Sequence, residues 1–403
     1  SEQPHVRDHE DRREHLSIPV NGVGFTGGLN GVIVRVASGG TYTATIVDSA
    51  SVPAFPSLFR WSFGAWSVAR GYPRAVTFFE DRLWFAGTDS DPQTVWGSRT
   101  SRYEDFRETD EDDSSLLLTL NTTRVNVIEW MSGQDSLILG TSGGEFQLQG
   151  TEGGGVSPIT PGNVRAPQRS TYGSRAGVLP VAVEGPVLFV QRAGRKIREL
   201  VFDLDTSSLI GADMTLLADH LTLGLVKQMA FQSEPDRILW VILENGTLLG
   251  FTYERSQQVT GWHRHVLGGT DVAVESISVI PHPDGDQDQL WVVARRTVNG
   301  SSKRYIERLE TSWQRGMALA DAFFLDCGLS YSGAPTTGIG GLFHLIGETT
   351  VYALADGLVV GPFTVSAAGT ITLAVAASKV HVGYLMTADL ETMRIEAGGA
   401  DGT

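Results

Sequence analysis

The sequence predicts an all-β protein, a β-propeller with blades of about 50 residues and a small C-terminal β module. A short apolar pattern recurs five times at a nearly constant spacing, polar turns separate the apolar runs, and glycine accounts for 47 of 403 residues. Repeats of this length are typical of four-stranded propeller blades, whereas stacked helix pairs would need a 3.6-residue period. Five blades are visible, and closure of the ring would make six.

Each repeat centres on a leucine, and successive leucines are 54, 51, 51 and 51 residues apart. We expect them to occupy equivalent core positions. The five segments are RLWFAG around Leu83, SLILGT around Leu137, VLFVQR around Leu188, ILWVIL around Leu239 and QLWVVA around Leu290.

Within a repeat, strands alternate with tight polar turns, as in AVTFF, EDR, LWFAG, TDSDPQ and TVWGS. Two turns contain Asn-Gly, at Asn245-Gly246 and Asn299-Gly300. Asn-Gly supplies the two positive-φ residues of a type I′ hairpin turn. The one helical signal is DMTLLADHL at 213–221, enough for a turn or two.

The repeat defines three expected regions. Residues 1–70 form an N-terminal β segment and an aromatic linker (55–73) that would close the propeller, because Val32 lies 51 residues before Leu83. Residues 71–310 form the propeller, and 311–403 form a C-terminal β module that we expect to be incomplete. Within the propeller, the Gly-, Pro- and Ser-rich stretch 150–176 is too long for an ordinary connection and predicts a partner-contacting loop.

The composition limits the function. With 46 acidic and 31 basic residues the net charge is −15, so the surface as a whole should repel nucleic acid and anionic membranes. Cys327 is the single cysteine, which excludes a disulfide within the chain. The polar first residues do not resemble a signal peptide, and no apolar run is long enough to span a membrane, so no stable membrane insertion is expected.

Ser142 lies in GTSGG (140–144), which matches the G-x-S-x-G pattern of hydrolases. The nucleophile of such enzymes needs a strand-to-helix elbow. Here the motif separates two predicted strands, so we expect a hairpin turn rather than catalysis.

Three other groups could bind a metal in principle. Asp284, Asp286 and Asp288 alternate like calcium-loop ligands, but the glycine is at 285 and position twelve is Arg295; a solvated turn is expected, with adventitious calcium as the alternative. The acidic run TDEDDSS (109–115) predicts a solvated loop.

His263 and His265 share a strand face without a third ligand at a supporting spacing, which predicts a packed or surface pair next to Trp262 rather than a metal site. We therefore expect no catalytic, cofactor-binding or metal site.

A long collinear series of segments resembles one family. The stretch 71–106, GYPRAVTFFEDRLWFAGTDSDPQTVWGSRTSRYEDF, is similar to the signature of the tail nozzle proteins of short-tailed bacteriophages, also called tail tubular protein B or tail stabilisation proteins. The resemblance covers about 55–395. Further matching segments, in the family's order, are GQDSLILGTSGGEFQLQG, STYGS, VLFVQRAGRKIRELVFD, DMTLLADHL, VTGWHRH and RYIERLE.

The resemblance implies a structural protein of the virion tail, made in the host cytoplasm and not an enzyme. It implies a homohexameric ring below the tail adaptor protein, in contact with tail fibres or spikes, that conducts and gates ejection of the genomic DNA without binding it tightly. The polar start and the ending GGADGT, where more strands are expected, suggest a fragment or processed chain. Two alternatives are a propeller-based glycan hydrolase, which would release reducing ends, and a glycan-binding host-recognition module, which would bind without turnover.

Overall fold

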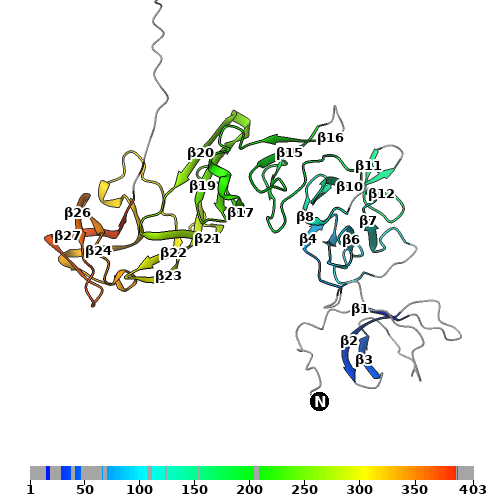
Figure 1. Ribbon diagram of the computed structural model, residues 1–403, viewed down its shortest axis with the longest axis horizontal. Coiled ribbons are helices and arrows are strands. Elements are labelled where there is room, and N and C mark those ends of the chain that lie inside the picture. Colours follow the sequence, from blue (N-terminus) through cyan, green and yellow to red (C-terminus); the bar gives the residue numbers. More distant parts are fainter. Residues whose placement is uncertain are drawn as a thin grey trace, which may run out of the picture. The chain divides into compact units, whose positions relative to one another are not determined.

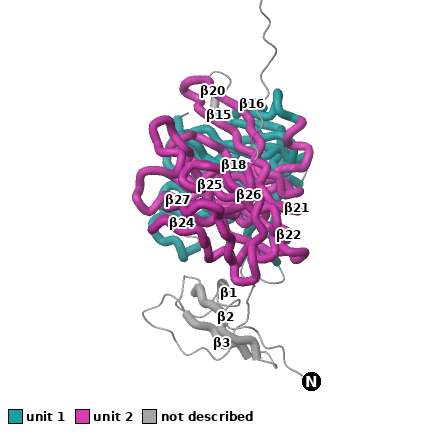
Figure 2. Tube along the Cα trace, turned by 90° about the vertical axis from the view of Figure 1, so that its left-hand side faces the viewer, with its two compact units in different colours: residues 1–219 teal, residues 220–403 magenta. Residues whose placement is uncertain are grey.

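A computed structural model describes residues 66, 70–106, 111–122, 125–152, 155–203, 208–386 and 388, together with the backbone of three N-terminal strands. The predicted aromatic linker, except for Trp66 and 70–73, lies outside the described residues, as does the C-terminal GGADGT. The chain divides into two compact units, residues 1–219 and 220–403, which are described separately (Figure 2).

Antiparallel sheets that follow one another along the chain make up both units (Figure 1). Unit 1 contains four sheets. The first is β1 (His15–Ile18), β2 (Leu29–Ala37) and β3 (Thr41–Ile46); the second is β4 (Ala75–Phe79), β5 (Arg82–Ala86), β6 (Thr94–Gly97) and β7 (Leu116–Thr119). The third is β8 (Ile128–Gly133), β9 (Leu137–Thr141), β10 (Gly144–Glu152), β11 (Gly155–Ser157) and β12 (Val164–Arg165); the fourth is β13 (Val181–Ala182), β14 (Val187–Val190), β15 (Ile197–Asp203) and β16 (Ser208–Asp213).

Unit 2 contains three sheets. They are β17 (Val226–Gln232), β18 (Ile238–Leu243), β19 (Leu248–Glu254) and β20 (Val259–His265); β21 (Thr270–Pro281), β22 (Asp288–Val298) and β23 (Ser301–Arg308); and β24 (Leu325–Ile339), β27 (Ile371–Leu385), β25 (Val351–Ala355) and β26 (Leu358–Phe363) in spatial order. Short 3₁₀ turns are η2 (Leu221–Gly224), η3 (Arg255–Gln257), η4 (Leu319–Asp321) and η5 (Phe343–Leu345).

The described residues contain no α-helix, and none of their helical segments could cross a membrane. The helical turn expected at 213–221 is wrong in detail, because the chain there makes non-helical turns and the first helical residues are those of η2. Asp213 Oδ1 stabilises the first of these turns by accepting hydrogen bonds from the Thr215 amide and hydroxyl.

The predicted β-propeller blades are confirmed at the level of the sheets. Each of the five repeated leucines lies on the second strand of its own up-and-down antiparallel sheet. Leu137, Leu188 and Leu239 are fully buried and Leu290 is 2% exposed. Leu83 differs because it is only half-buried, and Trp84 beside it is buried instead.

Apolar cores form between consecutive sheets, as expected of stacked blades. One core joins the β4–β7 sheet to the β8–β12 sheet, a second joins the latter to β13–β16, and a third joins β17–β20 to β21–β23. Trp84 and Trp130 each lie directly across from a glycine, Gly97 and Gly140. A Cβ atom at Gly140 would lie 2.0 Å from the Trp130 ring, so only glycine admits the indole there.

The two Asn-Gly turns differ. Asn299 and Gly300 both have positive φ, so the type I′ turn between β22 and β23 is confirmed. At Asn245-Gly246 only the glycine has positive φ. The Leu243 amide bonds to the Thr247 carbonyl there, so this hairpin has a longer loop than predicted.

The stretch 150–176 is not a free loop. β11 and β12 lie within it and both pair with β10, and Ile159 is 3% exposed in the core of unit 1. Residues 325–385 form the C-terminal sheet around a core of its own. The expected boundaries at 70/71 and 310/311 stay predictions.

Candidate functional site

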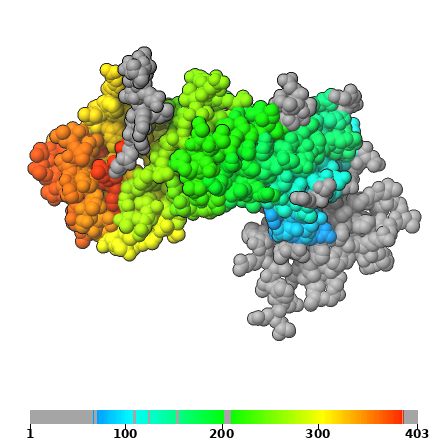
Figure 3. All heavy atoms as spheres, turned by 45° about the horizontal axis from the view of Figure 1, so that its top comes forward, coloured from blue at the N-terminus to red at the C-terminus, as the bar shows by residue number. Residues whose placement is uncertain are grey.

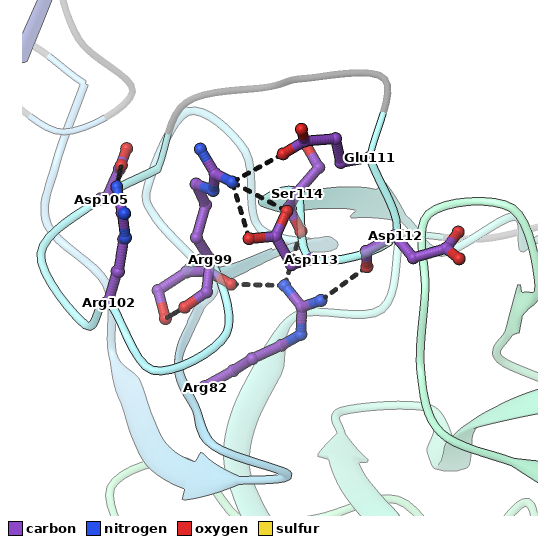
Figure 4. A network of polar contacts seen from close by, with 9 residues as sticks. Arg82, Arg99, Arg102, Asp105, Glu111, Asp112, Asp113 and Ser114 are labelled. Atoms are coloured by element: carbon purple, nitrogen blue, oxygen red, sulfur yellow. Dashed lines mark hydrogen bonds and ion pairs between the residues drawn. The ribbon is translucent and has the colours of Figure 1, made fainter.

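The acidic run 109–115 is the first candidate, and the structure describes it from 111 onward. Arg82, 2% exposed, donates to the backbone carbonyls of Ser98 (2.6 Å), Ser114 (2.5 Å) and Asp112 (3.1 Å). Figure 4 shows the guanidinium between the end of β6 and the acidic run. Burial lowers the pKa of Arg82, and the nearby carboxylates of Asp113 and Glu80 oppose this shift without cancelling it.

The carboxylates of the same run are held by a second arginine. Arg99 bonds to both oxygens of Asp113 (2.6 and 2.8 Å) and to Glu111 (3.0 Å), and the hydrogen bond from Arg99 lowers the pKa of Asp113 (Figure 4). Ser114 is 1% exposed. The prediction of a solvated loop agrees with the exposed side chains of Glu111 and Asp112, but it is wrong for Ser114 and Ser115, which are buried.

The G-x-S-x-G motif forms the hairpin turn between β9 and β10, as expected. The Ser142 hydroxyl accepts from the Val127 amide at 3.1 Å, and the Thr141 hydroxyl donates to the Gly144 carbonyl at 2.6 Å. Both hydroxyls therefore brace the turn.

Beside this hairpin lies a buried carboxylate that sequence reasoning missed. Glu145 is fully buried and accepts from the hydroxyls of Ser170 and Ser174 (3.1 Å for Ser174) and from the Tyr172 amide. Burial raises the pKa of Glu145. The Arg169 amide donates to the Glu145 carbonyl at 2.8 Å, so residues 169–174 are fixed along β10.

The aspartates of 284–288 do not converge. Asp288 Oδ2 accepts from the amides of Ser233 and Glu234 (2.8 and 3.3 Å), while Asp284 and Asp286 lie 3.5 Å from His282 Nδ1. Within the described ranges no group of three or more His, Cys, Asp or Glu side chains is placed to hold a metal ion.

The two histidines pack as a pair, as expected. His263 Nδ1 and His265 Nε2 lie 2.8 Å apart, and both rings contact Trp240 edge-on. Burial lowers the pKa of His265 to about 4 and also lowers the pKa of His263, so both rings are neutral at pH 7. The N–H of one ring donates a hydrogen bond to the bare nitrogen of the other.

Unit 2 has a cleft of about 660 Å³ beside β23 and the start of β24. Its lining is aromatic and acidic, including Trp291, Phe323, Glu307, Glu310 and Asp326.

Behind the cleft, Arg296 is fully buried and bonds bidentately to Glu307, with one contact at 2.9 Å, while its Nε donates to the Gly268 carbonyl at 2.8 Å. Burial alone would lower the pKa of Arg296, but the Glu307 carboxylate outweighs it and the pKa is raised. Asp326 accepts from the Gly268 amide at 2.6 Å, and burial raises its pKa.

Sequence reasoning singled out neither arginine. Arg82 follows two acidic residues and Arg296 lies between Arg295 and Thr297, so the sequence around each arginine gives no signal that its side chain is buried. Glu145, between Gly144 and Phe146, likewise gives no such signal.

Comparison with known proteins returned no matching family model and no matching curated protein. The solved structures that resemble the chain include a Lactobacillus plantarum protein (9% identity, 91% of this chain and 98% of that one, TM-score 0.34). Another is the β-propeller domain of Cps50 (Swd1) from Myceliophteria thermophila, with 8% identity over 59% of this chain and 73% of that one and a TM-score of 0.30. A third is an exo-β-1,3-galactanase from Phanerochaete chrysosporium, with 9% identity over 78% of this chain and 92% of that one and a TM-score of 0.29. TM-scores this low assign neither a family nor an activity.

Proposed function

We propose that the protein is a structural subunit of a bacteriophage tail nozzle, a homohexameric ring through which genomic DNA leaves the virion. The resemblance of residues 55–395 to that family supports this. One structural observation agrees with the proposal: charged side chains in the matching segments form hydrogen bonds and an ion pair within the protein.

The observation holds in several segments of the series. Arg82 in 71–106 binds three carbonyls, Glu145 in 133–150 binds Ser170 and Ser174 of STYGS, and Glu307 in RYIERLE binds Arg296. Satisfied polar networks rigidify the sheets that they connect, and rigid subunits agree with a structural role. We propose that the ring conducts and gates ejection in contact with the adaptor protein and with fibres or spikes.

The symmetry of the assembled particle tests the proposal. Electron microscopy of the purified chain, and of virions that contain it, should show a six-fold ring with an axial channel. A monomer that releases reducing ends from host polysaccharide would contradict the nozzle and favour a glycan hydrolase. Glycan binding without turnover by a non-ring particle would favour a host-recognition module.

A further inference from the structure

A serine and a histidine face each other across the C-terminal sheet of unit 2. Ser330 on β24 and His381 on β27 are directly opposite partners in the antiparallel ladder, and Ser330 Oγ lies 2.6 Å from His381 Nδ1. Figure 1 shows the two strands side by side, and in Figure 3 the orange and red part of unit 2, which contains them, lies at the surface. The hydroxyl and the imidazole are therefore within the hydrogen-bond reach that a nucleophile and its base require.

The second ring nitrogen of His381 sets the direction of this hydrogen bond. His381 Nε2 lies 2.9 Å from the Ala320 carbonyl oxygen, which can only accept, so Nε2 carries a proton. In the neutral ring Nδ1 is then bare and accepts from the Ser330 hydroxyl. His381 is 5% exposed, and the Phe323 ring packs edge-on against it. The Ala320 carbonyl thus holds the imidazole in one tautomer and one orientation, as the third member of a catalytic triad does.

The serine, unlike the histidine, is accessible. Ser330 is exposed and lines the 660 Å³ cleft, whereas His381 is buried. Shortly before the serine, two residues of β24, Cys327 and Gly328, oppose Gly383 alone on β27, and Cys327 has a φ of 51°. Bulges of this kind bend a strand and are common beside active sites. An exposed hydroxyl that bonds to a buried base in the wall of a cleft is the arrangement of an activated nucleophile.

We propose that Ser330 and His381 are the nucleophile and the base of an esterase site in this cleft. The inference does not depend on the nozzle ring. Ser330 Oγ attacks the carbonyl carbon of a carboxylic ester while His381 Nδ1 accepts the hydroxyl proton. The bond from this carbon to the alcohol oxygen then breaks, and the alcohol leaves with the proton from Nδ1. Water that gives a proton to Nδ1 attacks the acyl-serine, the bond to Oγ breaks, and Oγ regains a proton as the acid leaves.

The partner of His381 and the lining of the cleft indicate the class of substrate. The Ala320 carbonyl is neutral, so it stabilises an imidazolium less than a carboxylate would, and this favours esters over the less reactive amides. The cleft offers apolar contacts from Trp291, Phe323 and Leu329, which suit an apolar acyl group. Its lining contains three carboxyl groups against one arginine, Arg308, which disfavours anionic substrates. The substrate class is therefore a neutral ester of an apolar carboxylic acid.

Hydrolysis of p-nitrophenyl butyrate by the full chain tests the proposal. The unmodified chain should release p-nitrophenolate, and Ser330→Ala should lower the rate at least about 100-fold, with an unchanged Tm because the hydroxyl is exposed. Ser332→Ala is the matched control. Ser332 lies on the same face of β24 and is exposed, but its partner across the ladder is Lys379, so the rate should not change. Equal rates for Ser330→Ala and the unmodified chain, or no hydrolysis by the unmodified chain, would overturn the esterase site.

Covalent labelling identifies the nucleophile directly. A fluorophosphonate probe forms a bond to the oxygen of an activated serine and loses fluoride, so mass spectrometry of the labelled chain should locate the probe on Ser330. His381→Gln removes the base and should slow this labelling at least about 100-fold. If His381→Gln fails to fold, labelling of the unmodified chain still decides. A probe found on Ser332 as readily as on Ser330, or on neither serine, would contradict the proposal.

Discussion

β5 in unit 1 and β18 in unit 2 hold corresponding places in their sheets but bury different residues. In β18 the five residues from Leu239 to Leu243 are all buried, so both faces of the strand are covered. In β5 burial alternates, with Arg82 and Trp84 inside and Leu83 half-exposed. The repeated leucine therefore marks the second strand in every sheet and a core position in four of the five; in β5 the alternation is shifted by one residue, so that Trp84 is buried in place of Leu83.

The two buried arginines extend this contrast. Arg82 donates to backbone carbonyls, and burial lowers its pKa; Arg296 is paired with the Glu307 carboxylate, and its pKa is raised. Carbonyl partners belong to the backbone and cannot be changed by substitution, whereas a carboxylate partner can. Stability at the two sites should therefore respond differently to paired substitutions.

The largest effect is expected from an aspartate in a doubly covered strand. Leu239→Asp buries an unpaired charge and should cost more than about 4 kcal/mol, enough to unfold unit 2. Leu83→Asp is the matched control, with a cost of about 1 kcal/mol because the side chain reaches solvent. Chemical denaturation measures both, and equal costs would contradict the difference between the strands.

Removing one partner of the buried ion pair is the next largest change. Arg296→Met should cost up to about 3–5 kcal/mol because the largely buried Glu307 carboxylate, 16% exposed, is left without its cation. Adding Glu307→Leu should recover most of this loss. A double variant no more stable than the single one would show that the pair is not the source of the loss.

Arg82→Met should cost about 1–3 kcal/mol by removing the hydrogen bonds that Arg82 donates to three backbone carbonyls. No second substitution should recover it, because the acceptors are main-chain atoms, and Arg82→Lys should recover only part. Denaturation midpoints of the three variants measure this. Full recovery by lysine would mean that charge alone, rather than the three-carbonyl geometry, stabilises the site.

Lowering the pH should change the contributions of His265 and Glu145 to the free energy of unfolding in opposite directions. The His265 pKa is lowered to about 4, so its contribution to stability is present above pH 6.5 and is lost as the pH falls toward 4. The Glu145 pKa is raised, so its contribution is present below about 4.5 and is lost as the pH rises through the folded value. Thermal unfolding between pH 4 and 7 should show a weaker acid-side loss for His265→Gln and a weaker loss on raising the pH for Glu145→Gln. An unchanged pH profile in either variant would contradict its assignment.

The sequence predicted the sheets because spacing and alternation report backbone geometry directly. The 51-residue period located the second strand of five sheets, and Asn299-Gly300 located a turn. Sequence patterns did not reveal the buried side chains of Arg82, Glu145 and Arg296, because their hydrogen-bond partners are distant in the sequence. The carbonyls that Arg82 binds are 16 to 32 residues away, the serines that Glu145 binds are 25 and 29 residues away, and the carboxylate that Arg296 binds is 11 residues away. Such contacts depend on how the strands pair, which the spacing of residues along the chain does not report.

The smallest expected effect is on DNA binding, because the local charge of residues 165–199 differs in sign from the net charge of the whole chain. The net charge is −15, yet residues 165–199 contain seven basic and two acidic residues. Arg195 and Lys196 are paired with Asp219 and Asp213, so the local excess is partly neutralised. Duplex DNA should therefore bind weakly at about 0.15 M salt, and Arg192→Ala, which removes an exposed cation, should lower the salt slope measured at low salt by about 1. If the chain forms the proposed ring, lysines introduced at acidic positions that face its lumen should slow ejection by adding phosphate contacts. Tight, salt-sensitive binding by the unmodified protein would contradict a passive channel and indicate a role in packaging or processing DNA.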